Sequence, residues 1–139
     1  MNNKTFVAVA VLSALAVPGT AAAQTTGETA GEIEYQQACA SCHGQAGKGD
    51  GPVSEYLSVR VPNLTGISAR NDGMFPYRDL MLMIDGRNAE RQIGAHGIAM
   101  PVWGDRFMLD SNHENPVENE INTLGRISSL VNYLYSIQE

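Results

Sequence analysis

The sequence has few cysteines, few basic residues and hardly any alternating strand pattern. Its 139 residues include 2 Cys, and 9 Lys or Arg stand against 15 Asp or Glu, for a formal net charge of −6. Two cysteines alone cannot form a structural zinc site, which would need two further Cys or His at suitable spacing. The negative balance argues against nucleic acid and against an anionic membrane surface as partners. The scarcity of alternating apolar and polar residues predicts a mostly α-helical fold.

The longest apolar stretch of the chain lies at its N-terminus. Residues 6–17 are apolar except for one serine, and they follow Lys4. A Pro-Gly pair and small residues at 21–23 complete the layout of a secretory signal peptide, with the predicted cut between Ala23 and Gln24. The stretch is shorter than the ~20 residues of a membrane-spanning helix. We therefore expect cleavage rather than an uncleaved anchor, and a periplasmic location.

Cleavage would leave one small acidic domain. We divide the chain into a signal peptide (1–23), a flexible polar segment (24–30) and one domain (31–139), because this length suffices for one domain but not for two. Removal of Lys4 makes the charge one unit more negative, which favours partners with a basic or mainly apolar docking face. Nothing after the cut is long or apolar enough to span a bilayer, so we expect no membrane insertion of the mature protein.

Three stretches have the pattern of helices, and one between them does not. A short helix is expected just before residue 39, and a second over 76–84, where a proline suits the first turn and a glycine the exit. A third is expected at about 120–138. Its apolar residues at helical spacing are Ile127, Leu130, Val131, Leu134 and Ile137. Residues 44–52 hold four glycines, too many for a helix or strand interior, and are expected to form a loop.

The most informative residues are the run Cys39-Ala40-Ser41-Cys42-His43. This is the C-x-x-C-H pattern of covalent c-type haem attachment. Two thiols three positions apart can each form a thioether bond to the same porphyrin, and the adjacent imidazole then reaches the iron as an axial ligand. A thioredoxin-like redox pair would need a βαβ context, which the sequence lacks. Because the run occurs once, it predicts one covalently bound haem c.

Further motifs, in the same order along residues 31–137, resemble those of the class I monohaem bacterial c-type cytochromes. They are Gly47-Lys48-Gly49-Asp50-Gly51-Pro52, Pro62-Asn63-Leu64-Thr65, Ile84-Asp85-Gly86-Arg87 and Met100-Pro101-Val102-Trp103-Gly104. The resemblance implies an all-α fold in which the terminal helices cross near the haem edge and loops wrap both haem faces. It also implies a one-electron carrier that is not an enzyme. The alternative is a haem c subunit of a larger oxidoreductase complex.

The resemblance places the second axial ligand at Met100, where the family carries a Met-Pro pair after a Gly-rich loop. A thioether is a soft ligand that suits ferrous iron, so His/Met ligation raises the reduction potential. His96 and His113 are the alternative ligands and would lower the potential, but we expect both to be loop or surface residues. Two strong ligands leave no open iron site, which disfavours a third function class, an enzyme or gas sensor acting at the haem.

Five further residues are candidate haem contacts. The imidazole of the C-x-x-C-H run should donate its other ring N–H to a backbone carbonyl, and Pro52 and Pro62 are both candidates for the acceptor. Trp103, Tyr77 and Arg87 are candidate partners of the haem propionates. Ordinary packing or solvent exposure is the alternative for each of them.

Two features concern the architecture and the partners. Gly31 is expected to allow close approach of the two terminal helices, with Tyr35 and Tyr133 packed nearby. The polar segment 105–120 is longer than loop closure requires, and we expect a solvated loop there. An acidic docking surface for a redox protein partner is the alternative for this segment.

Overall fold

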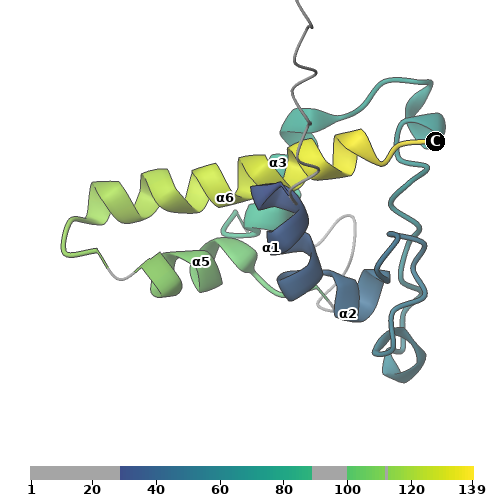
Figure 1. Ribbon diagram of the computed structural model, residues 1–139, viewed down its shortest axis with the longest axis horizontal. Coiled ribbons are helices and arrows are strands. Elements are labelled where there is room, and N and C mark those ends of the chain that lie inside the picture. Colours follow the sequence, from purple (N-terminus) through teal and green to yellow (C-terminus); the bar gives the residue numbers. More distant parts are fainter. Residues whose placement is uncertain (1–28, 89–99, 112) are drawn as a thin grey trace, which may run out of the picture.

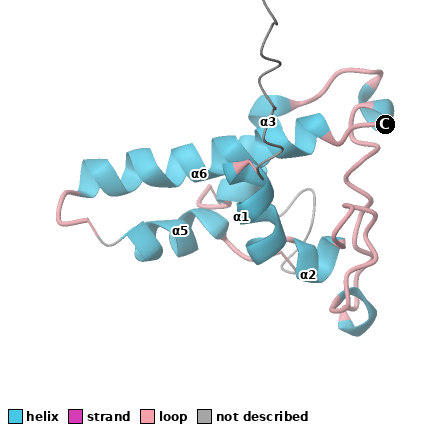
Figure 2. Ribbon diagram, viewed as in Figure 1, coloured by secondary structure: helices cyan, strands magenta, loops and turns pink. Residues whose placement is uncertain are grey.

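The computed structural model describes residues 29–88, 100–111 and 113–139. Within these ranges every regular element is a helix and no strand occurs, as Figure 2 shows, so the all-α prediction is confirmed. The elements are α1 (Ala30–Ala38), α2 (Ala40–His43), the 3-10 turns η1 (Ser54–Tyr56) and η2 (Ala69–Asn71), α3 (Tyr77–Asp85), α5 (Trp103–Ser111) and α6 (Pro116–Ser136). No helix in the described ranges is long and apolar enough to cross a membrane.

The long helix α6 organises the molecule (Figure 1). α1 and α3 pack against its C-terminal half, and α5 runs antiparallel beside its N-terminal half. The chain between α2 and α3 forms extended turns at the other end of the molecule. The predicted signal peptide (1–23) and His96 lie outside the described residues. Of the segment 24–30, only the last two residues are described. Thr29 caps α1, and Ala30 is its first residue.

Local sequence signals determine where the first helices begin and end. The Thr29 hydroxyl accepts a hydrogen bond of 3.2 Å from the backbone N–H of Glu32 and so caps the start of α1. α3 begins directly after Pro76 and ends at Gly86, whose φ of 68° is a conformation that glycine adopts without strain. The helix predicted over 76–84 is therefore confirmed, displaced by one residue.

The segment 105–120 is mostly helical, so the prediction of a solvated loop was wrong. Its first part belongs to α5, and α6 begins at Pro116 rather than near residue 120. The side chain of Asn115 caps α6 by accepting a hydrogen bond of 2.9 Å from the N–H of Val117. The two helices form a hairpin that projects from the body (Figure 1). Its polar residues lie on exposed faces while Phe107 is buried, which is ordinary amphipathic helix patterning.

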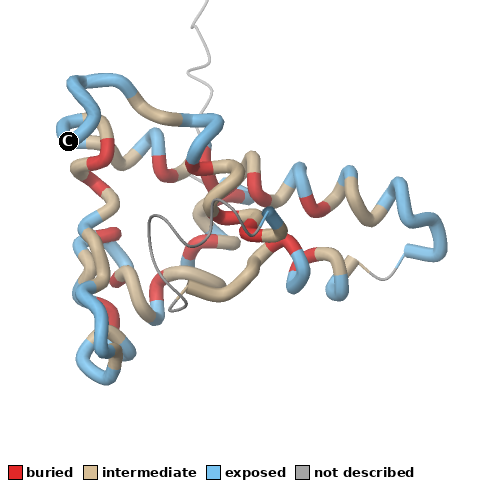
Figure 3. The backbone as a smooth tube through the Cα atoms, turned by 180° about the vertical axis from the view of Figure 1, so that it is seen from behind, coloured by how far each residue is buried: buried red, intermediate tan, exposed pale blue. Residues whose placement is uncertain are grey.

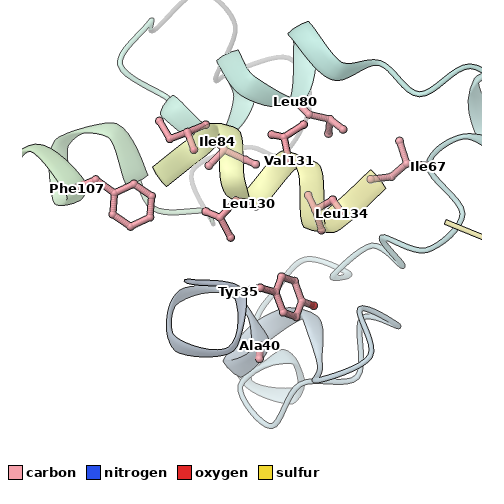
Figure 4. Packing of buried hydrophobic residues seen from close by; sticks show 10 residues of the cluster. Tyr35, Ala40, Ile67, Leu80, Ile84, Phe107, Leu130, Val131 and Leu134 are labelled. Atoms are coloured by element: carbon pink, nitrogen blue, oxygen red, sulfur yellow. The ribbon is translucent and has the colours of Figure 1, made fainter. Parts of the chain in front are cut away.

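The hydrophobic core lies where α6 meets the other helices (Figures 3 and 4). Ten buried residues form one cluster: Tyr35, Ala40, Ile67, Leu80, Ile84, Phe107, Ile127, Leu130, Val131 and Leu134. The four from α6 lie on the face that the helical spacing predicted. Ile137, predicted with them, follows the end of α6 and is partly buried against the cluster. The loop over 44–75 contributes only Ile67 to the buried cluster, so this loop has almost no core of its own.

α1 and α6 cross at Gly31. A Cβ at this position would collide with the backbone carbonyl of Ser129 and lie 3.0 Å from the Cβ of Tyr133. The rings of Tyr35 and Tyr133 pack beside the crossing with their centroids 5.1 Å apart, as predicted. The Tyr35 hydroxyl donates a 2.7 Å hydrogen bond to the carbonyl of Gly44. The crossing is thereby tied to the end of the C-x-x-C-H run.

Candidate haem-binding site

One cavity brings the C-x-x-C-H run and Met100 together. Its volume is about 470 Å³, and its wall includes Cys39, Cys42, His43 and Met100. Such a volume falls within the range of cofactor and small-molecule sites. Much of the remaining wall is apolar and comes from Ala38, Leu57, Val59, Val61, Pro62 and Pro101. Residues more than fifty positions apart in the sequence therefore line one apolar cavity.

The His43 side of the cavity is built by α2 and the glycine-rich loop over 44–52. The loop folds back on α2, and the N–H of Gly49 donates a 2.8 Å hydrogen bond to the carbonyl of His43. The N–H of Gly51 donates to the carbonyl of Cys42 at 3.2 Å. These backbone bonds fix the short helix that presents the thiols and the imidazole.

The glycines of this loop are required by close contacts. Gly49 has a φ of 83°, and a Cβ there would lie 2.6 Å from the carbonyl oxygen of Val61 and 3.2 Å from that of Pro62. A Cβ at Gly51 would lie 2.6 Å from the carbonyl carbon of Cys42. The predicted loop is confirmed. Its glycines let the chain pass between α2 and residues 61–62, which form the adjacent wall of the cavity.

Of the two candidate prolines, the structure brings Pro62 to His43. The Nδ1 atom of His43 lies 3.4 Å from the carbonyl oxygen of Pro62, so a ring protonated at Nδ1 donates toward that oxygen. Such a contact orients the ring and assigns Nε2 as the atom for a metal. Pro52 is exposed and is not part of the cavity wall.

Met100 enters the cavity from a different part of the chain. It precedes α5 by three residues and is partly buried against the core. Trp103, the first residue of α5, also lines the cavity, and its ring centroid lies 5.6 Å from that of Phe107. The start of α5 therefore provides the wall that carries the thioether.

Arg87 and Tyr77, two of the candidate propionate partners, do not line the cavity. The guanidinium of Arg87 forms ion pairs with Asp85 and Glu120. The hydroxyl of Tyr77 lies 3.0 Å from the hydroxyl of Ser128 and so links α3 to α6. His113, one of the alternative iron ligands, is exposed in the turn between α5 and α6 and is likewise absent from the wall.

Two arginines that the sequence did not single out do line the cavity. Arg60 and Arg106 are both exposed side chains in its wall, and the guanidinium of Arg106 lies 5.3 Å from the ring centroid of Trp103. Arginines pair well with carboxylates, so both are suited to haem propionates. The spacing of Arg106 three residues after Trp103 was a usable signal. It was missed because the segment 105–120 was expected to be a loop.

The electrostatics of Cys39 are unlike those of a redox or metal-binding cysteine. Burial raises the pKa of its thiol to about 12, and the charge of Glu34 adds to the shift. Reactive and metal-binding cysteines have lowered pKa values instead. In the described ranges no three His, Cys, Asp or Glu side chains gather as a site for a metal ion. The buried thiol of Cys39 is therefore unlike the thiolate of a reactive or metal-binding cysteine.

The residues present therefore fit a covalently bound haem. Two thiols and an imidazole lie on one part of an apolar wall, a thioether lies on another, and two arginines are exposed at its edge. Residues 29–102, just over half of the chain, match the family model described as Cytochrome c. The chain belongs to the cytochrome c family, and so it is a haem-based electron-transfer protein. No curated protein and no solved structure matches the chain.

Proposed function

We propose that this cytochrome is a class I monohaem carrier of single electrons, with His43 and Met100 as the axial ligands of one haem c. One observation supports this most strongly. Both side chains line the same cavity as Cys39 and Cys42, although Met100 comes from a distant part of the chain. The single C-x-x-C-H run in the sequence supports one haem.

The residues of the chain would have distinct tasks around the haem. The bound haem supplies the one-electron couple. The Pro62 carbonyl orients the ring of His43, while the thioether of Met100 favours the ferrous state and raises the potential. The apolar wall excludes water, and Arg60 and Arg106 offer positive charge to the propionates. Two strong ligands leave no iron site open for substrate, which favours a carrier over an enzyme.

The proposed location is the periplasm, and the proposed partners are redox proteins with a basic or apolar docking face. The location is supported by the signal-peptide pattern of residues 1–23. The choice of partner is supported by the net charge of −6 and a pI near 4.9.

A second candidate function is a haem subunit held in a larger oxidoreductase complex. It is favoured by an apolar stripe on the projecting half of α6. Val117, Ile121 and Leu124 follow one another at helical spacing, with 64%, 65% and 41% of their surface exposed. Exposed apolar stripes of this kind mark interaction surfaces. Gel filtration of a native extract separates the two functions, because a free carrier elutes at the size of the small chain.

Absorption spectra of the purified holoprotein in both redox states test the proposed carrier function. We expect a covalent haem, a far-red band of iron–sulfur ligation in the ferric form, and no carbon monoxide binding by the ferrous form at neutral pH. His96→Ala and His113→Ala variants serve as controls and should keep all three properties. Ready carbon monoxide binding, or loss of the far-red band in a histidine variant, would contradict His43/Met100 ligation.

A further inference from the structure

An ion-pair cluster joins α3 to α6 close to the start of α5 and the Met100 side of the cavity. The guanidinium of Arg87 donates to Asp85 at the end of α3, from Nε to Oδ1 at 2.5 Å and from Nη2 to Oδ2 at 3.1 Å. It also donates to Glu120 on α6, from Nη1 to Oε2 at 2.7 Å and from Nη2 to Oε1 at 2.9 Å. Both contacts are bidentate, the strongest and most directional form of this interaction. The hydrogen bond from Arg87 lowers the pKa of Glu120, so this carboxyl stays charged at neutral pH.

The start of α5 packs directly onto this cluster through Gly104. A Cβ at Gly104 would collide with Oδ1 of Asp85 and lie 2.6 Å from Nε of Arg87. A side chain of any size would therefore push α5 away from α3. The cluster sets where α5 begins relative to both α3 and α6.

The residue that α5 holds in place is Met100. Gly104 follows it by four residues, and an extended chain of that length spans at most about 14 Å. Pro101 and Trp103, which lie between them, line the same cavity as Met100. Fixing Gly104 thus restricts where the thioether can lie relative to His43 on the other part of the wall.

We propose that Arg87 is a positioning residue for Met100. By fixing the start of α5 between α3 and α6, it holds the thioether within reach of the iron that His43 binds. The inference rests on the His43/Met100 ligation of the proposed function. It gives Arg87 a role at the haem without contact with a propionate.

The test compares two arginines whose bidentate ion pairs lie at different helix contacts. Arg87→Gln removes the cluster at the start of α5. The matched control is Arg126→Gln, because Arg126 has the same 24% side-chain exposure and an equally bidentate ion pair, with Glu34 at 2.7 and 3.0 Å. That pair joins α6 to α1. Arg126 also contacts α5 beyond its start, 4.0 Å from the ring centroid of Phe107 and 3.5 Å from Asp110, whereas the atoms nearest a Cβ at Gly104 belong to Asp85 and Arg87. The control therefore removes an ion pair and contacts with α5 but leaves the cluster at its start in place. Imidazole is titrated into each ferric holoprotein while the far-red band is followed, and a thermal melt is recorded in parallel.

We expect Arg87→Gln to raise the apparent affinity for imidazole by about tenfold, because the thioether is displaced more easily, and to lower the reduction potential. Arg126→Gln should lower the melting temperature and leave the imidazole affinity within about twofold of wild type. In binding free energy, the tenfold change for Arg87→Gln is about 1.4 kcal/mol and the twofold limit for Arg126→Gln is about 0.4 kcal/mol. Arg87→Lys should recover only part of the effect, because a lysine cannot form the bidentate contacts. If Arg87→Gln fails to fold, Gly104→Ala tests the same contact between the start of α5 and the ion-pair cluster, with every charge kept. This variant should also weaken Met100 ligation.

Equal imidazole affinities in Arg87→Gln and Arg126→Gln would overturn the proposal and leave the ligation intact. The same holds if Gly104→Ala binds imidazole no more tightly than wild type. A wild-type ferric protein without the far-red band would overturn the proposed ligation and this inference with it.

Discussion

The two ends of this molecule are stabilised in different ways. The helical scaffold, defined as α1, α3, α5 and α6, contributes all but two of the ten buried core residues. The haem cradle, defined as residues 39–67, contributes only Ala40 and Ile67. It is held instead by backbone hydrogen bonds and by glycines in close contact with neighbouring backbone. The scaffold buries a core of its own side chains, whereas the cradle encloses a cavity and depends on what fills it.

Removing the covalent bonds to the haem should destabilise the protein most. A Cys39→Ala, Cys42→Ala double variant should give little folded protein, because the cradle has no core to replace the porphyrin. The yield, the far-UV circular dichroism and the thermal melt of the product measure this. Recovery of a cooperatively melting apoprotein at normal yield would contradict this account, since the cradle would then be stable without its cofactor.

Met100→Ala should act on the haem without removing it. We expect covalent haem, loss of the far-red ferric band and a reduction potential lowered by a sizeable part of the ~0.8 V range that axial ligands span. Met74→Ala, at a methionine that is 67% exposed, is the control and should change neither the band nor the potential. A Met100→Ala variant that keeps both would show that another residue is the ligand. The measurements are ferric spectra and redox titrations.

Two glycines in the loops separate the effect of close packing from that of backbone strain. Gly49 and Gly73 have nearly equal φ values of 83° and 80°, so an alanine at either suffers the same backbone strain. Only Gly49 has neighbours, because no atom lies within 4 Å of a Cβ at Gly73. We expect Gly49→Ala to be less stable than Gly73→Ala by about 1–3 kcal/mol, the range for overpacking. Denaturant unfolding of both holoproteins measures the difference, and equal free energies would refute the packing account of the cradle.

A second pair of glycines tests the scaffold. Here the two substitutions to alanine should change the stability of the protein in opposite directions. Gly125 lies in α6 with no atom within 4 Å of a Cβ, so Gly125→Ala should stabilise the protein by up to about 1 kcal/mol. Gly31→Ala should destabilise it by about 1–3 kcal/mol, since the Cβ collides with the backbone of Ser129. The melting temperatures of both variants show whether each substitution raises or lowers the stability. If both substitutions stabilise, the helix crossing is looser than the structure indicates.

The smallest effect is expected from the charges of the projecting hairpin. Electron transfer to a cationic cobalt complex should slow as salt is added, because the net charge of −6 attracts the oxidant and salt screens it over about 10 Å at 0.1 M. Reversal of the exposed Glu114 and Glu118 to Lys should slow it further if the hairpin steers the encounter. The electron-transfer rates are measured by stopped flow. Rates that stay constant or rise with salt would indicate that the docking site is the cavity edge with its two arginines, not the hairpin.

The sequence was most informative where local rules decide the structure. The C-x-x-C-H run, the proline and glycine at the ends of α3 and the apolar spacing of α6 all act within a few residues. Gly31 was also predicted correctly, because a resemblance of motifs placed the terminal helices together. The first three features need no knowledge of the rest of the chain, whereas the role of Gly31 depends on α6.

The sequence was least informative where distant residues meet. One ion-pair partner of Arg87 is Glu120, 33 positions later, and no local sequence pattern predicts such a pairing. Arg60 and Arg106 line one cavity although they lie 46 positions apart in the sequence. The hairpin over 105–120 was missed because its polar residues outnumber its apolar ones. Phe107 is buried only because α6 lies beside it, as tertiary packing overrides the local signal.

The crossing at Gly31 also has a consequence for the order of events during biosynthesis. A chain that emerges N-terminus first, from a ribosome or a secretion pore, releases the C-x-x-C-H run about 70 residues ahead of α6. Until α6 arrives, the residues that pack on Gly31 and Tyr35 in the folded chain, Ser129 and Tyr133, are missing. Docking of α6 then completes the scaffold, so the helix that leads into the C-x-x-C-H run is fixed only after the run itself has emerged.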